Sequence, residues 1–240
     1  MKKIYDHILN ATKSKKVQLA VLIDPDKFNP ELVRLCNKSN VSYFFVGGSR
    51  LYRSSVDKTI VAIRKISKIP VVIFPGDEKQ VSAKADALLF LSLISGRNPE
   101  YLIGKHVRSA SDIKRKKIEC ISTAYVLIDG ARESVTQQVT GTKPLKSTKE
   151  ICDTALAGEY LGMKLLYLEA GSGAKTNVHS KIISRVKKTV SIPLIVGGGI
   201  DSAEKAAAAT KAGADIVVVG NALEKDMDLL KKISPVFTKH

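Results

Sequence analysis

The feature that most constrains the fold is a series of eight short apolar runs, rich in β-branched residues and bounded by turn residues. Runs of this length and composition predict β-strands. Most of them are apolar at successive positions, which is typical of parallel strands buried on both faces. The runs are VQLAVLID, YFFVGG, PVVIFPG, ALLFLSL, STAYVLID, LLYLEA, PLIVGGG and DIVVVGN, and they begin near Val17, Tyr43, Pro70, Ala87, Ser122, Leu165, Pro193 and Asp215.

Helix-like segments separate most of these runs, and this alternation favours a barrel. Eight βα units in 240 residues fit a (β/α)₈ TIM barrel better than a doubly wound sheet, which usually has fewer strands. The composition agrees, because 44% hydrophobic and 26% charged residues are close to globular averages. We therefore predict a single TIM-barrel domain over residues 1–240. Its helices are expected over residues 31–39, 56–67, 99–116, 149–162, 178–189 and 203–212.

The third βα unit departs from this pattern. Only the segment DEKQVSAKAD separates the third run from the fourth, and it is too short for a full helix with two loops. We expect the third outer helix to be missing or replaced by a short extended segment. Its absence would leave a gap in the barrel wall near the apolar run LLFLSLI, through which a hydrophobic group could enter.

The cysteines and the N-terminal segment indicate a cytoplasmic protein. Cys36, Cys120 and Cys152 are odd in number, far apart in sequence and free of any CxxC spacing, so we interpret them as buried structural thiols in a reducing compartment. Residues 1–16 lack the continuous apolar segment of a signal peptide. No apolar run approaches the roughly 18 residues that a membrane-spanning helix needs.

The chain is strongly basic, with 39 Lys and Arg against 23 Asp and Glu and a formal net charge of +16. Such an excess attracts nucleic acids, anionic lipid headgroups or phosphorylated metabolites, and a solvated lysine-rich surface explains it equally well. The KRKK cluster at residues 114–117 lacks the interleaved aromatic residues of a single-strand binder. We expect no nucleic-acid partner, whereas peripheral contact with a membrane stays open.

The sixth, seventh and eighth runs all end in glycine-rich turns, at residues 167–173, 197–199 and 220–221. In a TIM barrel the working residues stand at the carboxyl ends of the strands, and phosphate groups often bind after strands seven and eight. Glycine lets backbone N–H groups approach an anion closely. A tight turn would explain any one of these glycines, but their position on adjacent strands predicts a phosphate site.

A carboxylate and a phenol accompany the first of these turns. Beside a phosphate-bound alcohol, Glu169 could accept the hydroxyl proton as the oxygen attacks an electrophile, with Tyr167 orienting the same hydroxyl. The alternative for Glu169 is a salt bridge to a neighbouring Lys or Arg at a strand end.

Hard oxygen ligands gather at the ends of the first and second runs. Asp24, Asp26 and Ser49 suit Mg²⁺, which takes one or two protein oxygens and fills its octahedron with water and substrate phosphates, and Lys27 and Arg50 would add positive charge. The alternative is a strand-to-helix turn in which Asp caps the helix. Two anion sites at one barrel mouth suggest two phosphorylated substrates.

Several stretches together resemble the geranylgeranylglyceryl phosphate synthase family. They are LIDPDK, VGGS, ADALLFLSLISGRNPEYLIGKHV, YLEAGSGA, VGGGI and VVGN, in order from Asp24 to Asn221. The SLISGRNPEYLIG segment is the most specific, because barrel geometry does not require it. The resemblance implies a modified TIM barrel that has lost the third helix. It also implies an enzyme of ether-lipid biosynthesis, a prenyltransferase that joins an allylic diphosphate to the 3-hydroxyl of sn-glycerol 1-phosphate and releases diphosphate.

The resemblance also implies roles for individual residues and a Mg²⁺ cofactor. Asp24 and Ser49 match the Mg²⁺ positions, and Glu169 matches the carboxylate that activates the glycerol hydroxyl, with Tyr167 beside it. The positions that match the glycerol 1-phosphate site are Tyr167, Leu168, Glu169, Ala170, Gly171, Ser172, Gly173, Gly198, Gly199, Gly220 and Asn221.

One departure within the family bears on the prenyl donor. Some relatives, including bacterial heptaprenyl-transferring ones, carry Lys two residues before the metal Asp, where this chain has Leu22. The LIDPDK form is similar to the other branch, which mostly uses the geranylgeranyl donor. Tyr101 is a candidate for the floor of the prenyl groove, with a core tyrosine as the alternative.

A phosphosugar isomerase, epimerase or lyase on the same barrel is the alternative function, because phosphate loops on strands seven and eight are shared widely. A metal-dependent epimerase would place histidines at strand ends, and His7, His106, His179 and His240 do not lie at the predicted ends. Family members are dimers or hexamers, so the resemblance implies a homo-oligomer.

Overall fold

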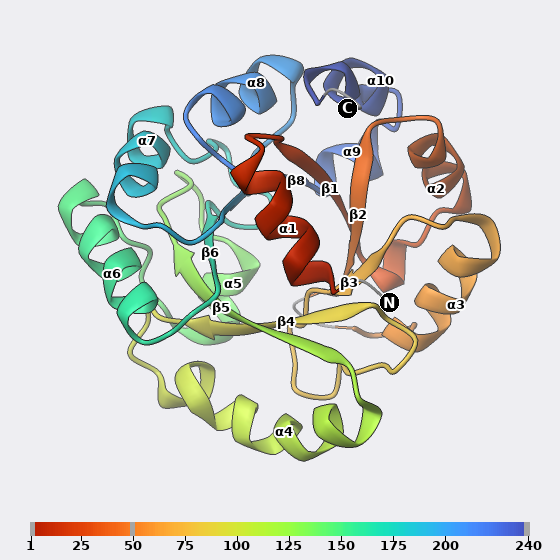
Figure 1. Cartoon of the computed structure of the whole chain (residues 1–240), viewed down its shortest axis with the longest axis horizontal. Helices are drawn as coiled ribbons and strands as arrows, with labels where there is room; N and C mark the ends of the chain where they lie inside the picture. Colours follow the sequence, from red (N-terminus) through yellow and green to blue (C-terminus); the bar gives the residue numbers. More distant parts are fainter. Residues whose placement is uncertain (1–2, 49–50, 238–240) are drawn as a thin grey trace.

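The computed structural model describes residues 3–48 and 51–237, and its centre is a closed barrel of eight parallel strands in the order β1 to β8 (Figure 1). The predicted barrel is therefore confirmed, because each apolar run forms one strand. The strands are β1 (Gln18–Ile23), β2 (Val41–Val46), β3 (Val71–Ile73), β4 (Ala87–Leu93), β5 (Glu119–Leu127), β6 (Leu165–Glu169), β7 (Leu194–Gly197) and β8 (Ile216–Val219).

The outer helices surround the barrel (Figure 1). Several begin where a Ser or Asn side chain accepts a hydrogen bond from the first turn, as Ser55 does from the N–H of Lys58. The six predicted helices correspond to α2 (Pro30–Asn37), α3 (Val56–Ile66), η2 with α4 (Glu100–Gly104 and Lys105–Lys116), α6 (Thr148–Tyr160), α7 (Ser180–Thr189) and α8 (Ala203–Lys211). Short elements that we did not predict are η1 (Pro25–Lys27), α5 (Val135–Thr140), α9 (Asn221–Lys225), α10 (Leu229–Ile233) and η3 (Ser234–Val236).

The predicted gap after the third strand is also present. Residues 74–86, which connect β3 to β4, are all described and contain no helix. The connection is held to α4 by ion pairs, with Lys105 Nζ 2.8 Å from Asp77 Oδ2 and 3.2 Å from Glu78 Oε2. Charged side chains thus line the opening that an outer helix would otherwise cover.

An amphipathic helix, α1 (Ile4–Lys13), lies across the amino-terminal end of the barrel (Figure 1). Ile4 and Ile8 are buried against the barrel interior, and Glu119 accepts hydrogen bonds from the N–H groups of Ile4 and Tyr5 at 2.7 and 3.1 Å. We did not predict this helix. It closes one end of the barrel and leaves the carboxyl ends of the strands as the open face.

Two clusters of buried side chains form the core. One fills the space between the strands and the outer helices, and the other fills the barrel interior. Within the described residues, no helix is long and apolar enough to cross a membrane. The prediction of three buried cysteines is wrong in part. Cys36 is buried on α2, but Cys120 is exposed, because it lies near the start of β5 at the rim of the barrel, and Cys152 is half-buried on α6.

Candidate active site

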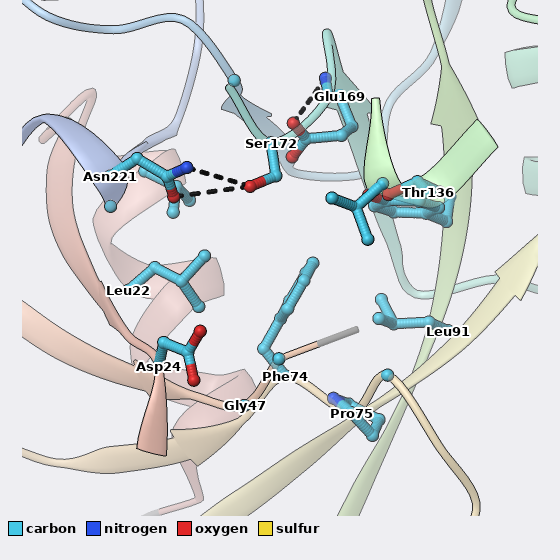
Figure 2. Close-up of a pocket in the computed structure, with 18 of the residues that line it drawn as sticks. Leu22, Asp24, Gly47, Phe74, Pro75, Leu91, Thr136, Glu169, Ser172 and Asn221 are labelled. Atoms are coloured by element: carbon cyan, nitrogen blue, oxygen red, sulfur yellow. Dashed lines mark hydrogen bonds between the residues drawn. The ribbon is translucent and has the colours of Figure 1, made fainter. Parts of the chain in front are cut away.

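A cavity of about 830 Å³ opens at the carboxyl ends of the strands and extends into the gap before β4 (Figure 2). It brings together most of the predicted site residues: Asp24, Tyr167, Glu169, Gly171, Ser172, Gly173, Gly198, Gly199, Gly220 and Asn221 all line it. Leu168 and Ala170 do not, because they alternate to the outer face of β6 and pack in the core between strands and helices. Ser49 and Arg50 lie outside the described residues.

The glycine turns after β6, β7 and β8 meet at one side of this cavity. Ser172 Oγ lies 3.0 Å from Asn221 Nδ2, which joins the β6 turn to the start of α9 (Figure 2). Gly173, Gly198 and Gly199 have φ angles of 75°, 81° and 69°, a left-handed conformation that favours glycine. Within the described residues, no hydrogen bond of a turn or loop uses the N–H groups of these three glycines. The arrangement can therefore offer several backbone donors to one phosphate group.

Glu169 is buried next to these turns, and it forms no ion pair with any residue that the structure describes, so its salt-bridge alternative finds no partner there. Its Oε1 accepts a hydrogen bond from the N–H of Gly171 at 2.7 Å. Burial raises the pKa of Glu169 to about 7, although the bonds from Gly171 and Tyr167 act in the opposite direction. A carboxyl with a pKa near neutral is well suited to accept a proton from an alcohol.

Gly198 makes room for this carboxyl. A Cβ atom at Gly198 would lie 2.4 Å from Glu169 Oε1 and 2.8 Å from the backbone nitrogens of Ala170 and Gly171. Glycine is thus required here twice, by its φ of 81° and by the close approach of the carboxylate.

Asp24 lies across the cavity from Glu169, at the end of β1 (Figure 2). Its Oδ1 accepts the N–H of Asp26 at 3.0 Å, so the helix-capping alternative also holds, while no described residue bonds Oδ2. Gly48 leaves room beside this carboxylate, because a Cβ there would lie 3.3 Å from Oδ1. Within the described residues, no group of three or more His, Cys, Asp or Glu side chains could hold a metal ion by itself. One open carboxylate fits a Mg²⁺ ion that takes most of its ligands from substrate phosphates and water.

Two neighbours of Asp24 have structural partners. Asp26 accepts hydrogen bonds from the N–H groups of Tyr52, Arg53 and Ser54 at 2.6, 3.0 and 2.7 Å, so it anchors the connection between β2 and α3. Lys27 Nζ pairs with Glu224 Oε2 at 2.8 Å, which links the turn after β1 to α9.

An apolar arm of the cavity runs between β4 and α4. Its lining includes Leu88, Phe90, Leu93, His106 and Ile113. Tyr101 also lines the cavity, and its hydroxyl donates to the carbonyl oxygen of Val139 at 3.0 Å. The arm follows the gap left by the missing helix and suits a long hydrocarbon chain.

Sequence reasoning missed the aromatic residues in the middle of the cavity. Phe74 and Tyr125 line it together with Tyr167, although they follow or belong to three different strands. Phe74 lies within the third apolar run and directly follows β3, so its position at a strand end was a usable signal. Thr136 on α5 also lines the cavity, and the capping pair Ser134 and Gln137 could have predicted that helix.

The fold and the site define a phosphate-binding TIM barrel with a buried general base and a hydrophobic arm. Residues 11–237 match the model of the PcrB family, and the chain belongs to that family. The resemblance predicted from the sequence is therefore confirmed.

Named relatives agree with this assignment. The chain is 48% identical over 239 residues to a geranylgeranylglyceryl phosphate synthase from Chitinophaga pinensis, which covers 97% of this chain and 94% of that protein. It is 44% identical over 212 residues to the synthase from Thermococcus kodakarensis, with 85% and 83% covered. The crystal structure of (S)-3-O-geranylgeranylglyceryl phosphate synthase from Thermoplasma acidophilum, in complex with sn-glycerol-1-phosphate, superposes with a TM-score of 0.91 at 32% identity and covers 99% and 98% of the two chains.

Proposed function

We propose that this protein is a geranylgeranylglyceryl phosphate synthase, which joins the prenyl group of geranylgeranyl diphosphate to the 3-hydroxyl of sn-glycerol 1-phosphate. The observation that carries the proposal is that Glu169, beside the glycine turns, and Asp24, on the opposite side, line a single cavity. A phosphate on one side, a diphosphate on the other and a base between them suit the attack of an alcohol on an allylic carbon. The similarity to synthases over nearly the full chain supports the same reaction.

The acceptor would bind at the turns after β6, β7 and β8. Backbone N–H groups of Gly173, Gly198 and Gly199 would hold its phosphate, and this leaves the 3-hydroxyl close to Glu169. Burial, followed by the charge of Glu169, raises the pKa of Tyr167 well above its usual range, so its hydroxyl stays protonated and donates to the carboxylate. This bond holds Glu169 toward the hydroxyl whose proton it accepts.

The donor would bind with its diphosphate near Asp24 and its hydrocarbon chain in the apolar arm. When bound, Mg²⁺ held by Asp24, with Ser49 as the proposed second ligand, would neutralise charge on the leaving diphosphate. The bond between the allylic carbon and the diphosphate oxygen breaks, and the electron pair leaves with the diphosphate. The glycerol oxygen forms the new ether bond to that carbon and loses its proton to Glu169.

Three further features belong to the proposal. The free thiols Cys36, Cys120 and Cys152 favour a reducing compartment, so we place the protein in the cytoplasm. The excess of basic residues favours peripheral contact with an anionic membrane, into which the lipid product must pass. The family resemblance favours a homo-oligomer, either a dimer or a hexamer.

The test is incorporation of radiolabelled sn-glycerol 1-phosphate into a product that organic solvent extracts. The assay uses prenyl diphosphates of increasing length, with Mg²⁺ or with a chelator. We expect Mg²⁺-dependent product that is greatest with the geranylgeranyl donor and is lost in Glu169→Gln. If the folded protein gives no extractable product with any donor, the proposal is wrong, and the phosphosugar isomerase, epimerase or lyase becomes the function to test.

A further inference from the structure

Three aromatic rings meet in the middle of the active-site cavity, between the two predicted phosphate sites. The ring centroids of Phe74 and Tyr167 are 5.3 Å apart, those of Tyr125 and Tyr167 5.3 Å, and those of Phe74 and Tyr125 6.0 Å. Figure 2 shows the Phe74 ring pointing into the space that Asp24 and Glu169 flank. The cluster therefore lies where the bond to the diphosphate would break and the ether bond would form.

Contacts with strand β2 hold the Phe74 ring in this position. The N–H of Phe74 donates to the carbonyl oxygen of Val46 at 2.9 Å, which extends the pairing of β3 with β2 by one residue. Phe45 from β2 lies nearly parallel to the ring, with the centroids 6.4 Å apart and the planes at 5°. Phe74 is half-buried although it is apolar, because part of its surface faces the cavity.

Burial raises the pKa of both tyrosines in the cluster well above the usual range, so their hydroxyl groups stay protonated. The cluster thus presents ring surface and no phenolate, which matters because an electron-poor allylic carbon would readily alkylate a phenolate oxygen.

We propose that Phe74 is a catalytic residue whose ring, with Tyr125 and Tyr167 around it, stabilises the positive charge that develops on the allylic carbon as the diphosphate leaves. The face of an aromatic ring carries negative electrostatic potential and attracts a cation within about 6 Å. The interaction arises only in the transition state, so it accelerates the reaction without tightening the binding of the uncharged prenyl chain. The inference rests on the proposed prenyl transfer.

The test replaces Phe74 site-specifically with mono-, di- and trifluorinated phenylalanine, which weaken the potential of the ring stepwise and barely change its size. We expect the single-turnover rate to fall at each step, by about tenfold over the series, as the cation–π attraction is lost. The affinity for a thiolo analogue of the prenyl diphosphate should stay constant over the same series.

Phe44 provides the matched control, because it is fully buried in the core between strands and helices and does not line the cavity. Fluorination of Phe44 should leave the rate unchanged. Equal rates across the Phe74 series, or an equal fall in the Phe44 series, would overturn the inference. A lack of product from the unsubstituted protein would instead overturn the proposed function, so the two failures are distinguishable. Phe74→Leu, with its melting temperature checked, should be slower than every fluorinated variant.

Discussion

At the scale of single residues, the buried carboxyl of Glu169 makes activity depend on pH. A general base works only when it is deprotonated, and burial raises the pKa of Glu169 to about 7. We therefore expect kcat/KM for sn-glycerol 1-phosphate to rise with pH up to about 7 and then to level off. A pH–rate profile across neutrality measures this, and a profile that is flat below neutral pH would exclude Glu169 as the base.

The same burial makes the ionised carboxyl of Glu169 destabilising. In an unfolded chain the pKa of Glu is about 4.3, whereas in the folded protein burial raises it to about 7. The folded state binds the proton more tightly than the unfolded state, so protonation of Glu169 stabilises the folded protein. This stabilisation is fully present below the unfolded pKa and is lost as the pH rises through the folded pKa. Glu169→Gln should be inactive and yet more stable at alkaline pH, by up to about 4 kcal/mol.

Urea denaturation of both proteins, in acid and in alkaline buffer, measures this difference. Below the unfolded pKa of Glu the two free energies of unfolding should be similar, because both side chains are then neutral in either state. If the two free energies of unfolding differ by the same amount at both pH values, the substitution acts through packing and not through charge.

Gly198 offers a prediction with a close internal control. Ala at this position would have to adopt a left-handed backbone conformation, and its Cβ would lie 2.4 Å from Glu169 Oε1. Gly162 has a similar φ of 82°, but nothing lies within 4 Å of its Cβ position. Gly162→Ala should cost about 1 kcal/mol of stability with normal turnover, whereas Gly198→Ala should lower kcat about a hundredfold or more. Thermal unfolding and steady-state kinetics test both, and equal loss of activity would contradict the role assigned to Gly198.

At the scale of elements, the helix-free connection between β3 and β4 depends on charged contacts with α4. Lys105 pairs with Asp77 and Glu78 across the opening to the apolar arm, and it lines the cavity. We expect Lys105→Ala to raise KM for the prenyl diphosphate several-fold and to leave KM for sn-glycerol 1-phosphate unchanged, because it loosens only this wall.

The control for Lys105 is Lys149→Ala, which removes an exposed pair with Asp153 on α6, away from the cavity. Ion pairs at the protein surface contribute little to stability, so neither variant should unfold readily. Initial rates with each substrate varied in turn separate the two KM values. Equal changes in both constants would show that Lys105 acts on the whole site and not on the donor side.

The elements also show what sequence patterns could and could not predict. The eight strands were predictable, because each is a short, mostly apolar run bounded by turn residues, and the missing helix followed from the length of DEKQVSAKAD alone. Helix α1 precedes the first βα unit, so the repeat gave no reason to expect it. The aromatic cluster was not predictable, because Phe74, Tyr125 and Tyr167 meet only through the register of the closed barrel. Leu168 and Ala170 were placed in the site by family position, although strand alternation turns them outward.

At the scale of the whole molecule, the barrel is closed at one end by α1 and open at the other, and the apolar arm reaches the outside through one side wall. A lipid product could leave along this wall without crossing the polar mouth. The outer surface of η2 and α4 carries two exposed apolar side chains, Ile103 on η2 and Val107 on α4, which are 59% and 68% exposed. The basic residues Lys114 and Arg115 follow on the last turn of α4.

A net charge of +16 should draw such a surface toward anionic lipid headgroups. We expect the protein to sediment with phosphatidylglycerol vesicles at low salt and to be released as salt is added, because attraction between exposed charges is screened beyond about 10 Å at 0.1 M salt. It should not sediment with neutral phosphatidylcholine vesicles.

Exposed apolar residues on η2 and α4 offer a second test of this membrane contact. Replacing Ile103 and Val107 together by Ser should weaken vesicle binding. Replacing Tyr160 and Leu161, an exposed pair at the end of α6, by Ser should leave vesicle binding unchanged. Equal binding to both kinds of vesicle would show that charge does not direct the membrane contact. Stronger retention on duplex DNA than on anionic vesicles would assign the charge to a nucleic acid.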